Sequence, residues 1–228
     1  SGVTDYFELL KTTENTPSGN PKDQFHYTRD TAEYEAESEQ GVSVGYGASY
    51  ALVSASPPRE LVITLVENGS PAAQAGLSRG TKIVTVDGVD LINGSDADTL
   101  NAGLWPRQLG EEHDFEVIDP GADQRRAVTM TSTTFTTDPV PLAEIISTDS
   151  GSVGYLLFTE HILTAEQQLV DAFAAMREAN VTDLVLDLRY NRGGYLYLAN
   201  QVSYMIAGSG VSGRIFGALQ FNDKNPST

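Results

Sequence analysis

The sequence predicts two units of different fold class, a small β-rich barrel with two helices followed by part of an α/β core. Three observations support this. Short β-branched runs separated by glycine turns begin near Gly41, and a helix start lies between two of these runs at Ser70. After Pro141 the chain changes to the order strand, helix, strand, helix, which is typical of an α/β fold. The 228 residues are enough for two units of about 100 residues each.

The composition is that of an ordinary globular protein, with 40% hydrophobic and 20% charged residues. Its apolar runs are shorter than the roughly 20 residues that cross a bilayer, so we expect no transmembrane segment. A net charge of −17 with only 14 basic residues argues against a nucleic-acid partner, although solubility alone also explains the acidity. The absence of cysteine excludes disulfides, thiolate zinc sites and thiol catalysis, and we expect no cofactor.

Residues 1–40 form a polar lead-in segment in this interpretation. A short apolar cluster lies between Tyr6 and Leu10, and a loop rich in proline and glycine follows it. The alternating glutamates from Glu33 to Glu39 favour a solvated helix or loop over a metal site, because carboxylates two residues apart fall on different helix faces. The first residues lack the basic and apolar regions of a signal peptide, so we expect any signal to be absent or already removed.

The elements of the β-rich unit follow in order. Residues 61–66 and 82–86 are β-branched strand sequences, and the second ends at an Asp-Gly hairpin turn at 87–88. Between them, Ser70 suits an N-cap, Pro71 the first helical position and Gly76 a left-handed helix end. A second helix is predicted at 96–104, and further strands at 115–118 and 127–130. Residues 132–141 are rich in threonine and proline and are expected to be a connector.

The second unit occupies residues 142–228. A strand is predicted at 153–158, and the sequence TAEQ from Thr164 is a capping box that opens a helix ending near Asn180. An apolar run at 184–188 is typical of a strand buried in a parallel sheet, and another helix is predicted at 196–208. A glycine loop joins the last strand to the last helix, at the carboxyl end of the strand where α/β folds place their functional residues.

Residues 69–83 read GSPAAQAGLSRGTKI and resemble the G-S-P-A-x-x-A-G-L-x-x-G-D-x-I signature of bacterial PDZ domains, with Thr81 in place of the usual aspartate. The resemblance covers residues 41–131. It implies recognition of peptides with a free C-terminus, preferably an apolar one. Gly45, Tyr46, Gly47 and Ala48 are the candidate receiving loop, since glycines let consecutive N–H groups converge on a carboxylate while the next strand edge pairs with the peptide. The alternative is that the glycines only permit a tight turn.

Residues 187–194 read DLRYNRGG and look like the D-L-R-x-N-x-G-G segment of the C-terminal processing, or tail-specific, serine peptidases. Residues 151–156, GSVGYL, match the strand that leads into that family's core, and the family has the same order of PDZ domain and peptidase domain. The resemblance implies a partial α/β peptidase core of the ClpP/crotonase-like fold. It also implies an endopeptidase that uses a Ser/Lys dyad, with a periplasmic or cell-envelope location.

The resemblance makes Gly193 and Gly194 the oxyanion-hole candidates, because bare N–H groups between a buried strand and a helix start can face a developing negative charge. They also suit a tight turn, and both roles are compatible. Asp187 and Arg189 are expected to hold the loop by a local ion pair rather than to act in chemistry.

No Ser/Lys dyad is predicted within the chain. Lysine occurs only at 11, 22, 82 and 224, and the one S-x-x-x-K match, from Ser78 to Lys82, crosses a glycine turn. A triad of His161, a serine and Asp187 is the weaker alternative. We therefore expect the nucleophile and its lysine to lie beyond residue 228 and the chain alone to be inactive. Uncovered apolar faces would favour a homo-oligomer. The competing interpretation is a non-catalytic PDZ-type peptide-binding protein with a degenerate peptidase-like half.

Overall fold

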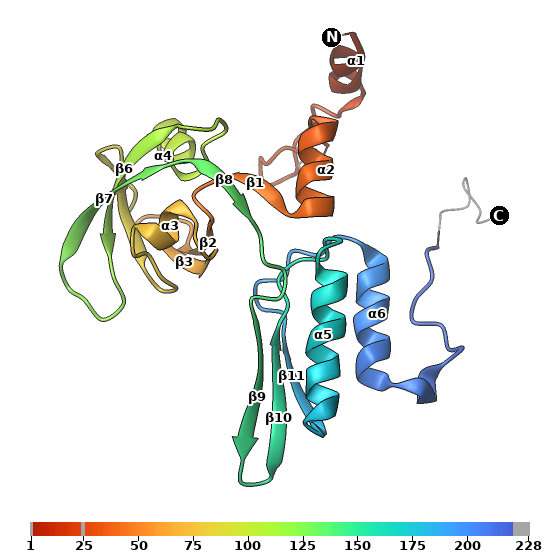
Figure 1. Cartoon of the computed structure of the whole chain (residues 1–228). Helices are drawn as coiled ribbons and strands as arrows, with labels where there is room; N and C mark the ends of the chain where they lie inside the picture. The colour runs from red at the N-terminus through yellow and green to blue at the C-terminus, as the bar shows by residue number, and fades with distance from the viewer. Residues whose placement is uncertain (1, 24–25, 221–228) are drawn as a thin grey trace. The chain divides into compact units, whose positions relative to one another are not determined.

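The computed structural model describes residues 2–23 and 26–220 (Figure 1). The chain divides into two compact units, residues 1–35 and residues 36–228. The first contains helix α1, Gly2–Leu10, which has no buried residue. Helix α2, Thr31–Gln40, is exposed as its glutamates predict. Within the described part of the chain, no helix combines the length and apolar character needed to cross a membrane.

The β-rich part of the second unit is built on an antiparallel sheet with the strand order β2-β3-β4-β6-β7, and the short β5 pairs with β4. The strands are β2 (Ala48–Ser54), β3 (Glu60–Val66), β4 (Lys82–Val86), β5 (Val89–Asp90), β6 (Glu112–Ile118) and β7 (Arg125–Thr131). The predicted fold class is confirmed, with one correction. Among the described strands the sheet is open, because β2 and β7 do not pair with each other, so the unit is not a closed barrel.

Two helices pack with this sheet. Helix α3, Pro71–Gln74, begins as predicted, with the Ser70 side chain accepting from the Ala73 N–H and proline at the first position. Helix α4, Ala97–Leu104, is capped by Asp96. Together with the inner faces of the strands they enclose an apolar core. The turn residues Gly76 and Asp87 have positive φ, as their sequence positions predict.

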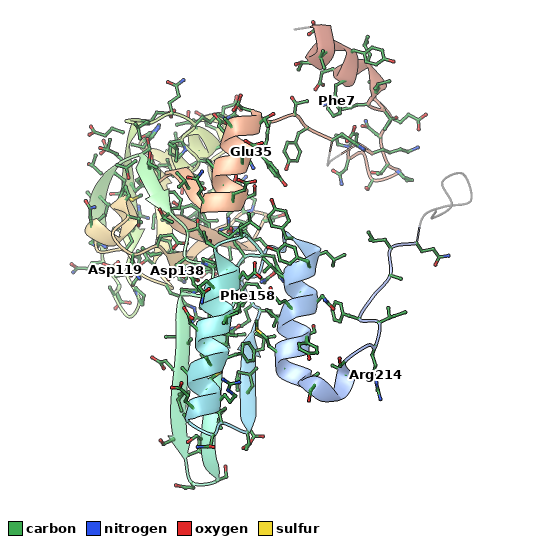
Figure 2. The ribbon with its side chains drawn as sticks, turned by 45° about the vertical axis from the view of Figure 1, so that its right-hand side comes forward. Phe7, Glu35, Asp119, Asp138, Phe158 and Arg214 are labelled. Carbon is green, nitrogen blue, oxygen red and sulfur yellow. The ribbon has the colours of Figure 1, made fainter. Side chains whose placement is uncertain are left out.

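The departure of Thr81 from the PDZ signature has a structural explanation. Its hydroxyl accepts from the Ser78 N–H at 3.3 Å and donates to Asp119 at 3.3 Å, so threonine caps this turn as aspartate would. Asp119 (labelled in Figure 2) is also held by Arg126, whose guanidinium donates to the carbonyls of Ala75 and Gly76. The signature loop is therefore fixed by a polar network from strand β7.

A two-stranded ribbon lies outside the main sheet. It pairs β1, Val42–Gly45, with β8, Thr133–Thr136, and its last pair joins Gly45 to Thr133. Strand β8 falls inside the predicted connector, which is therefore more ordered than its composition indicates. At the other end of the ribbon, Thr137 donates to the Gly41 carbonyl, and the nearby Ser38 carbonyl accepts from the Leu163 N–H. The chain thus enters and leaves the β-rich part through adjacent strands.

The α/β part has a three-stranded sheet of order β11-β10-β9, with helices α5 and α6 side by side along it (Figure 1). Its elements are β9 (Leu142–Thr148), β10 (Gly151–Leu157), α5 (Ala165–Glu178), β11 (Asp183–Asp187), α6 (Leu196–Ala207) and the 3-10 turn η1 (Ser209–Val211). Strands β10 and β11 are parallel, as predicted, whereas β9 is antiparallel and was not predicted. In the core between this sheet and the helices, Leu156 and Phe158 pack against buried side chains of α5 and α6. The predicted capping box at Thr164 is not formed, because the Thr164 backbone is helical and its side chain makes no capping hydrogen bond.

Candidate active site and peptide-binding site

Asp187 ends strand β11 and anchors the glycine loop. Its carboxylate accepts three hydrogen bonds from the Arg189 side chain at 2.5–2.9 Å, one from the Arg189 N–H at 3.0 Å and one from the Tyr155 hydroxyl at 2.5 Å. The Arg189 guanidinium and the Tyr155 hydroxyl hold the pKa of this carboxyl well below its usual range. The expected local ion pair is therefore present.

Asn191 fixes the turn that follows. Its Nδ2 donates to the Phe158 carbonyl at 3.0 Å, and its Oδ1 accepts from the Gly193 N–H at 2.8 Å. On the other side of the loop, the His161 N–H donates to the Gly193 carbonyl at 2.7 Å, and the His161 carbonyl accepts from the Tyr195 N–H at 2.8 Å. The loop is thus bound to the segment after β10, whose Phe158 is labelled in Figure 2. Sequence reasoning gave Asn191 no role beyond its place in the motif.

The two glycines differ in what they can offer a ligand. Both have positive φ, +78° at Gly193 and +131° at Gly194, a backbone conformation that favours glycine at these positions. A side chain on Gly194 would lie 2.4 Å from the His161 carbonyl oxygen, whereas Gly193 has open space. The Gly193 N–H is already used by Asn191. The Gly194 N–H donates no hydrogen bond within residues 26–220, and it lies at an exposed position two residues before helix α6.

The triad alternative is not formed by the described residues. Arg189 and Tyr155 occupy the carboxylate of Asp187, and Nδ1 of His161 is buried without a partner in the described part of the chain. Burial lowers the pKa of the His161 imidazole, which packs against Phe158 with ring centroids 4.5 Å apart. These contacts make His161 part of the loop's support.

Each lysine in the described residues is bound in an ion pair, and none of them is buried. Lys11 contacts Glu8 at 2.7 Å, Lys22 contacts Glu14 at 2.5 Å and Lys82 contacts Glu60 at 2.6 Å. Lys82 lies in a β-strand, so the S-x-x-x-K match forms no helical dyad. Lys224 lies outside the described residues. The Ser203 hydroxyl donates to the Ala199 carbonyl within its own helix at 2.8 Å.

The candidate receiving loop joins the ribbon to strand β2. Gly45 and Gly47 have φ of +150° and +66°, and a side chain on Gly47 would lie 2.3 Å from Cβ of Ser70. Neither the Tyr46 N–H nor the Gly47 N–H donates a hydrogen bond within the described residues. The Tyr46 side chain is buried against Phe115, so this residue can offer only its backbone to a peptide carboxylate at the loop.

Strand β2, which begins at Ala48, is the edge of its sheet in the described structure, so one side of its backbone can pair with a further strand. The glycine loop contacts this region. Arg192 donates to the Ser49 hydroxyl on β2 and pairs with Glu160 at 3.2 Å. Tyr190 accepts from Arg79 of the signature loop at 2.7 Å. The candidate peptide strand and the candidate oxyanion loop are therefore joined by direct side-chain contacts.

Glu67, which carries no functional signal in the sequence, is buried beside this contact. Its Oε2 accepts from the Asp138 N–H at 3.0 Å, and its own N–H donates to the Gly47 carbonyl. Burial raises the pKa of Glu67 to about 7; the negative charges of Asp138 and Glu160 add to the increase, while the Asp138 N–H and Arg192 oppose it. The site thus contains a carboxyl that titrates near neutral pH.

Comparison with known proteins agrees with this geometry. Residues 152–223 match peptidase family S41. The chloroplastic carboxyl-terminal-processing peptidase 2 of Arabidopsis thaliana is 30% identical over 161 residues, 68% of this chain and 30% of the relative. A carboxyl-terminal-processing protease of Synechocystis sp. (strain ATCC 27184 / PCC 6803 / Kazusa) is 28% identical over 128 residues, 56% of this chain and 30% of the relative. The chain thus spans about a third of the length of the curated relatives it matches.

Among solved structures, a photosystem II D1 C-terminal processing protease has the same fold, with a TM-score of 0.50 and 24% identity over 72% of this chain and 44% of that one. The glycine loop, the order of the two parts and the family and sequence matches lead to one conclusion: residues 152–223 belong to peptidase family S41, and the chain is related to C-terminal processing peptidases.

Proposed function

We propose that this chain is part of a serine endopeptidase that captures free protein C-termini through residues 41–131 and cleaves with a Ser/Lys dyad contributed from outside the described residues. Residues 142–228 supply the first part of the peptidase domain. The single observation behind the proposal is the Gly194 N–H, which belongs to an exposed residue, has no acceptor in the described structure and lies in a loop held on both sides. A preorganised donor of this kind stabilises the oxyanion of acyl transfer.

The proposal assigns the oxyanion role to one of the two candidate glycines. Gly193 acts as the structural member of the pair, because Asn191 accepts from its N–H. Gly194 is the donor, and the positive end of helix α6, which begins at Leu196, adds to the potential there. Loss of one oxyanion donor lowers turnover by about 100- to 1000-fold in enzymes where it was measured. The proposal therefore assigns a contribution of this size to the Gly194 N–H.

Peptide capture is assigned to the free edge of β2 and to the N–H groups of the receiving loop. An incoming chain would add a strand at that edge, and its carboxylate would meet the N–H groups from Gly45 to Ala48. The partners are then proteins or peptides with free C-termini. The chloroplastic and cyanobacterial relatives are processing proteases. By analogy with the tail-specific peptidases that the sequence resembles, we place this protein in the cell envelope or periplasm.

One observation favours a second candidate, a non-catalytic peptide-binding protein. The described lysines are all ion-paired and none is buried, and a lysine acts as a general base only when burial lowers its pKa. The two candidates share the peptide site and differ only in turnover.

Two measurements test the proposal. Calorimetric titration of the chain with one peptide as free acid and as C-terminal amide tests capture, and we expect the amide to bind at least about tenfold more weakly because it lacks the charge that the loop faces. Equal affinity would contradict the carboxylate site. Incubation of the full gene product with casein, an unstructured substrate, tests turnover. Peptide binding without turnover by the full gene product would favour the binding protein over the peptidase.

A further inference from the structure

Glu67 lies beside the backbone of the receiving loop. It directly follows strand β3, is 8% exposed and donates its N–H to the Gly47 carbonyl at 2.8 Å. A side chain on Gly47 would lie 3.2 Å from Cβ of Glu67. Since α-carbons paired across neighbouring strands are about 5 Å apart, a peptide carboxylate bound by the N–H groups of Tyr46 and Gly47 would lie roughly 5–10 Å from the Glu67 carboxyl.

Three charged residues from other parts of the chain face the Glu67 carboxyl. Asp138, which follows β8, donates its N–H to Oε2 of Glu67 at 3.0 Å, but its own carboxylate adds a negative charge nearby. Glu160, which follows β10, adds a second negative charge, and Arg192 of the glycine loop adds a positive one. Arg192 is itself paired with Glu160 at 3.2 Å. The charge around Glu67 is therefore negative on balance, and ionisation of this buried group is unfavourable.

A peptide carboxylate at the receiving loop would add one more negative charge beside Glu67. With an effective dielectric constant of about 20 and partial screening by salt, two like charges at this separation weaken binding by roughly tenfold. Burial and the charges of Asp138 and Glu160 already raise the pKa of Glu67 to about 7, against the opposing Asp138 N–H and Arg192. Near neutral pH, uptake of a single proton by Glu67 therefore removes the repulsion.

We propose that Glu67 takes up a proton when the receiving loop binds a peptide carboxylate, so that C-termini are captured more tightly at mildly acidic than at mildly alkaline pH. The inference rests on the proposed capture of C-termini. Below about pH 7 Glu67 is already protonated, and the carboxylate meets no charge there. Between about pH 7 and pH 8 the bound carboxylate draws in the proton, and above this range both charges are present and binding is weakest. Glu67 thus regulates the peptide site through its charge, without contacting the peptide.

The test is calorimetric titration of the chain with an N-acetylated, free-acid peptide that has no other titratable group. Binding should be about five- to tenfold tighter at pH 6 than at pH 8.5. At pH 7.5, titrations in phosphate and in Tris, which differ in their enthalpy of ionisation, should show uptake of about half a proton per bound peptide. The change Glu67→Gln should abolish the uptake and give the affinity of the parent chain at pH 6 at both pH values. Glu144→Gln, on the exposed strand β9, is the matched control and should keep both effects.

The possible outcomes separate this inference from the proposed function. Equal affinity at both pH values without proton uptake would overturn the role of Glu67 and leave the capture of C-termini intact. If Glu67→Gln kept the pH dependence, another group would take up the proton, and the inference would be wrong. Proton uptake by the parent chain is measured without any variant, so its absence is decisive even if the glutamine variant does not fold. If the free-acid peptide binds at neither pH, the proposed capture fails, and the inference fails with it.

Discussion

The change Glu67→Gln should stabilise the protein at alkaline pH and leave it nearly unaffected at acidic pH. Burial, Asp138 and Glu160 raise the pKa of Glu67 from 4.5 to about 7 against the opposing Arg192 and Asp138 N–H. Between these two pH values the folded chain holds a proton that the unfolded chain has lost, so the free energy of unfolding falls as pH rises across that window. At about 1.4 kcal/mol per pH unit, ionised Glu67 costs roughly 3 kcal/mol above pH 7. Glutamine has no such proton and keeps an oxygen for the Asp138 N–H.

Urea denaturation at pH 5 and pH 8 measures the effect. We expect the glutamine variant to gain about 2–3 kcal/mol over the parent chain at pH 8 and much less at pH 5. Glu144→Gln, on the exposed strand β9, is the control and should shift neither value by more than about 0.5 kcal/mol. A loss of stability of similar size at both pH values would refute the reasoning, because it would mean that Glu67 is ionised and stabilising in the folded chain.

Three further predictions concern the glycine loop and the chain as a whole. Gly194→Ala should destabilise the chain by about 3 kcal/mol, because a β-carbon would clash with the His161 carbonyl oxygen. Gly193→Ala should cost only about 1 kcal/mol, because its β-carbon has open space and only the positive φ is unfavourable. Equal losses of stability in urea denaturation would contradict the described loop. Asp187→Asn should lower the free energy of unfolding by about 2 kcal/mol at pH 7. This difference between parent and variant should shrink as acid protonates the parent carboxyl, which happens below about pH 4 in the unfolded chain and at lower pH in the folded chain. A constant difference down to pH 2 would count against the ion pair. The 228-residue chain alone should not degrade casein. Turnover that survives repurification and is lost in a Ser203→Ala variant would refute this expectation. Light scattering should find oligomers of the chain, formed through exposed apolar side chains.

Local chemistry made much of the fold predictable. Ser70, Pro71 and Gly76 define a short helix through interactions that span a few residues, and the structure contains each of them. The same holds for the Asp187–Arg189 pair, whose members are two residues apart. Thr164 shows the limit of such reasoning. A threonine caps a helix only when its own backbone is extended, and the backbone of Thr164 is helical.

Features set by distant contacts could not be read from the sequence. Strand β9 has no alternation of buried and exposed residues, since its side chains are all exposed, and only pairing with β10 reveals it. Glu67 follows an ordinary β-branched strand, and its burial depends on Asp138, far along the chain. The unequal roles of Gly193 and Gly194 likewise depend on Asn191 and His161, which approach the loop from different sides.

The ribbon of β1 and β8 has a consequence for how this protein could be cut and rebuilt. Gly45 and Thr133 are paired residues of neighbouring strands, so their α-carbons are about 5 Å apart. Residues 46–132 therefore form an insertion whose two ends lie close together. The insertion is attached to the α/β part, which Ser38, on the other side of the ribbon, also contacts through the Leu163 N–H. A two-residue turn such as Asn-Gly in place of residues 46–132 would close the ribbon into a hairpin. A different domain whose ends are equally close could therefore be joined at the same two positions.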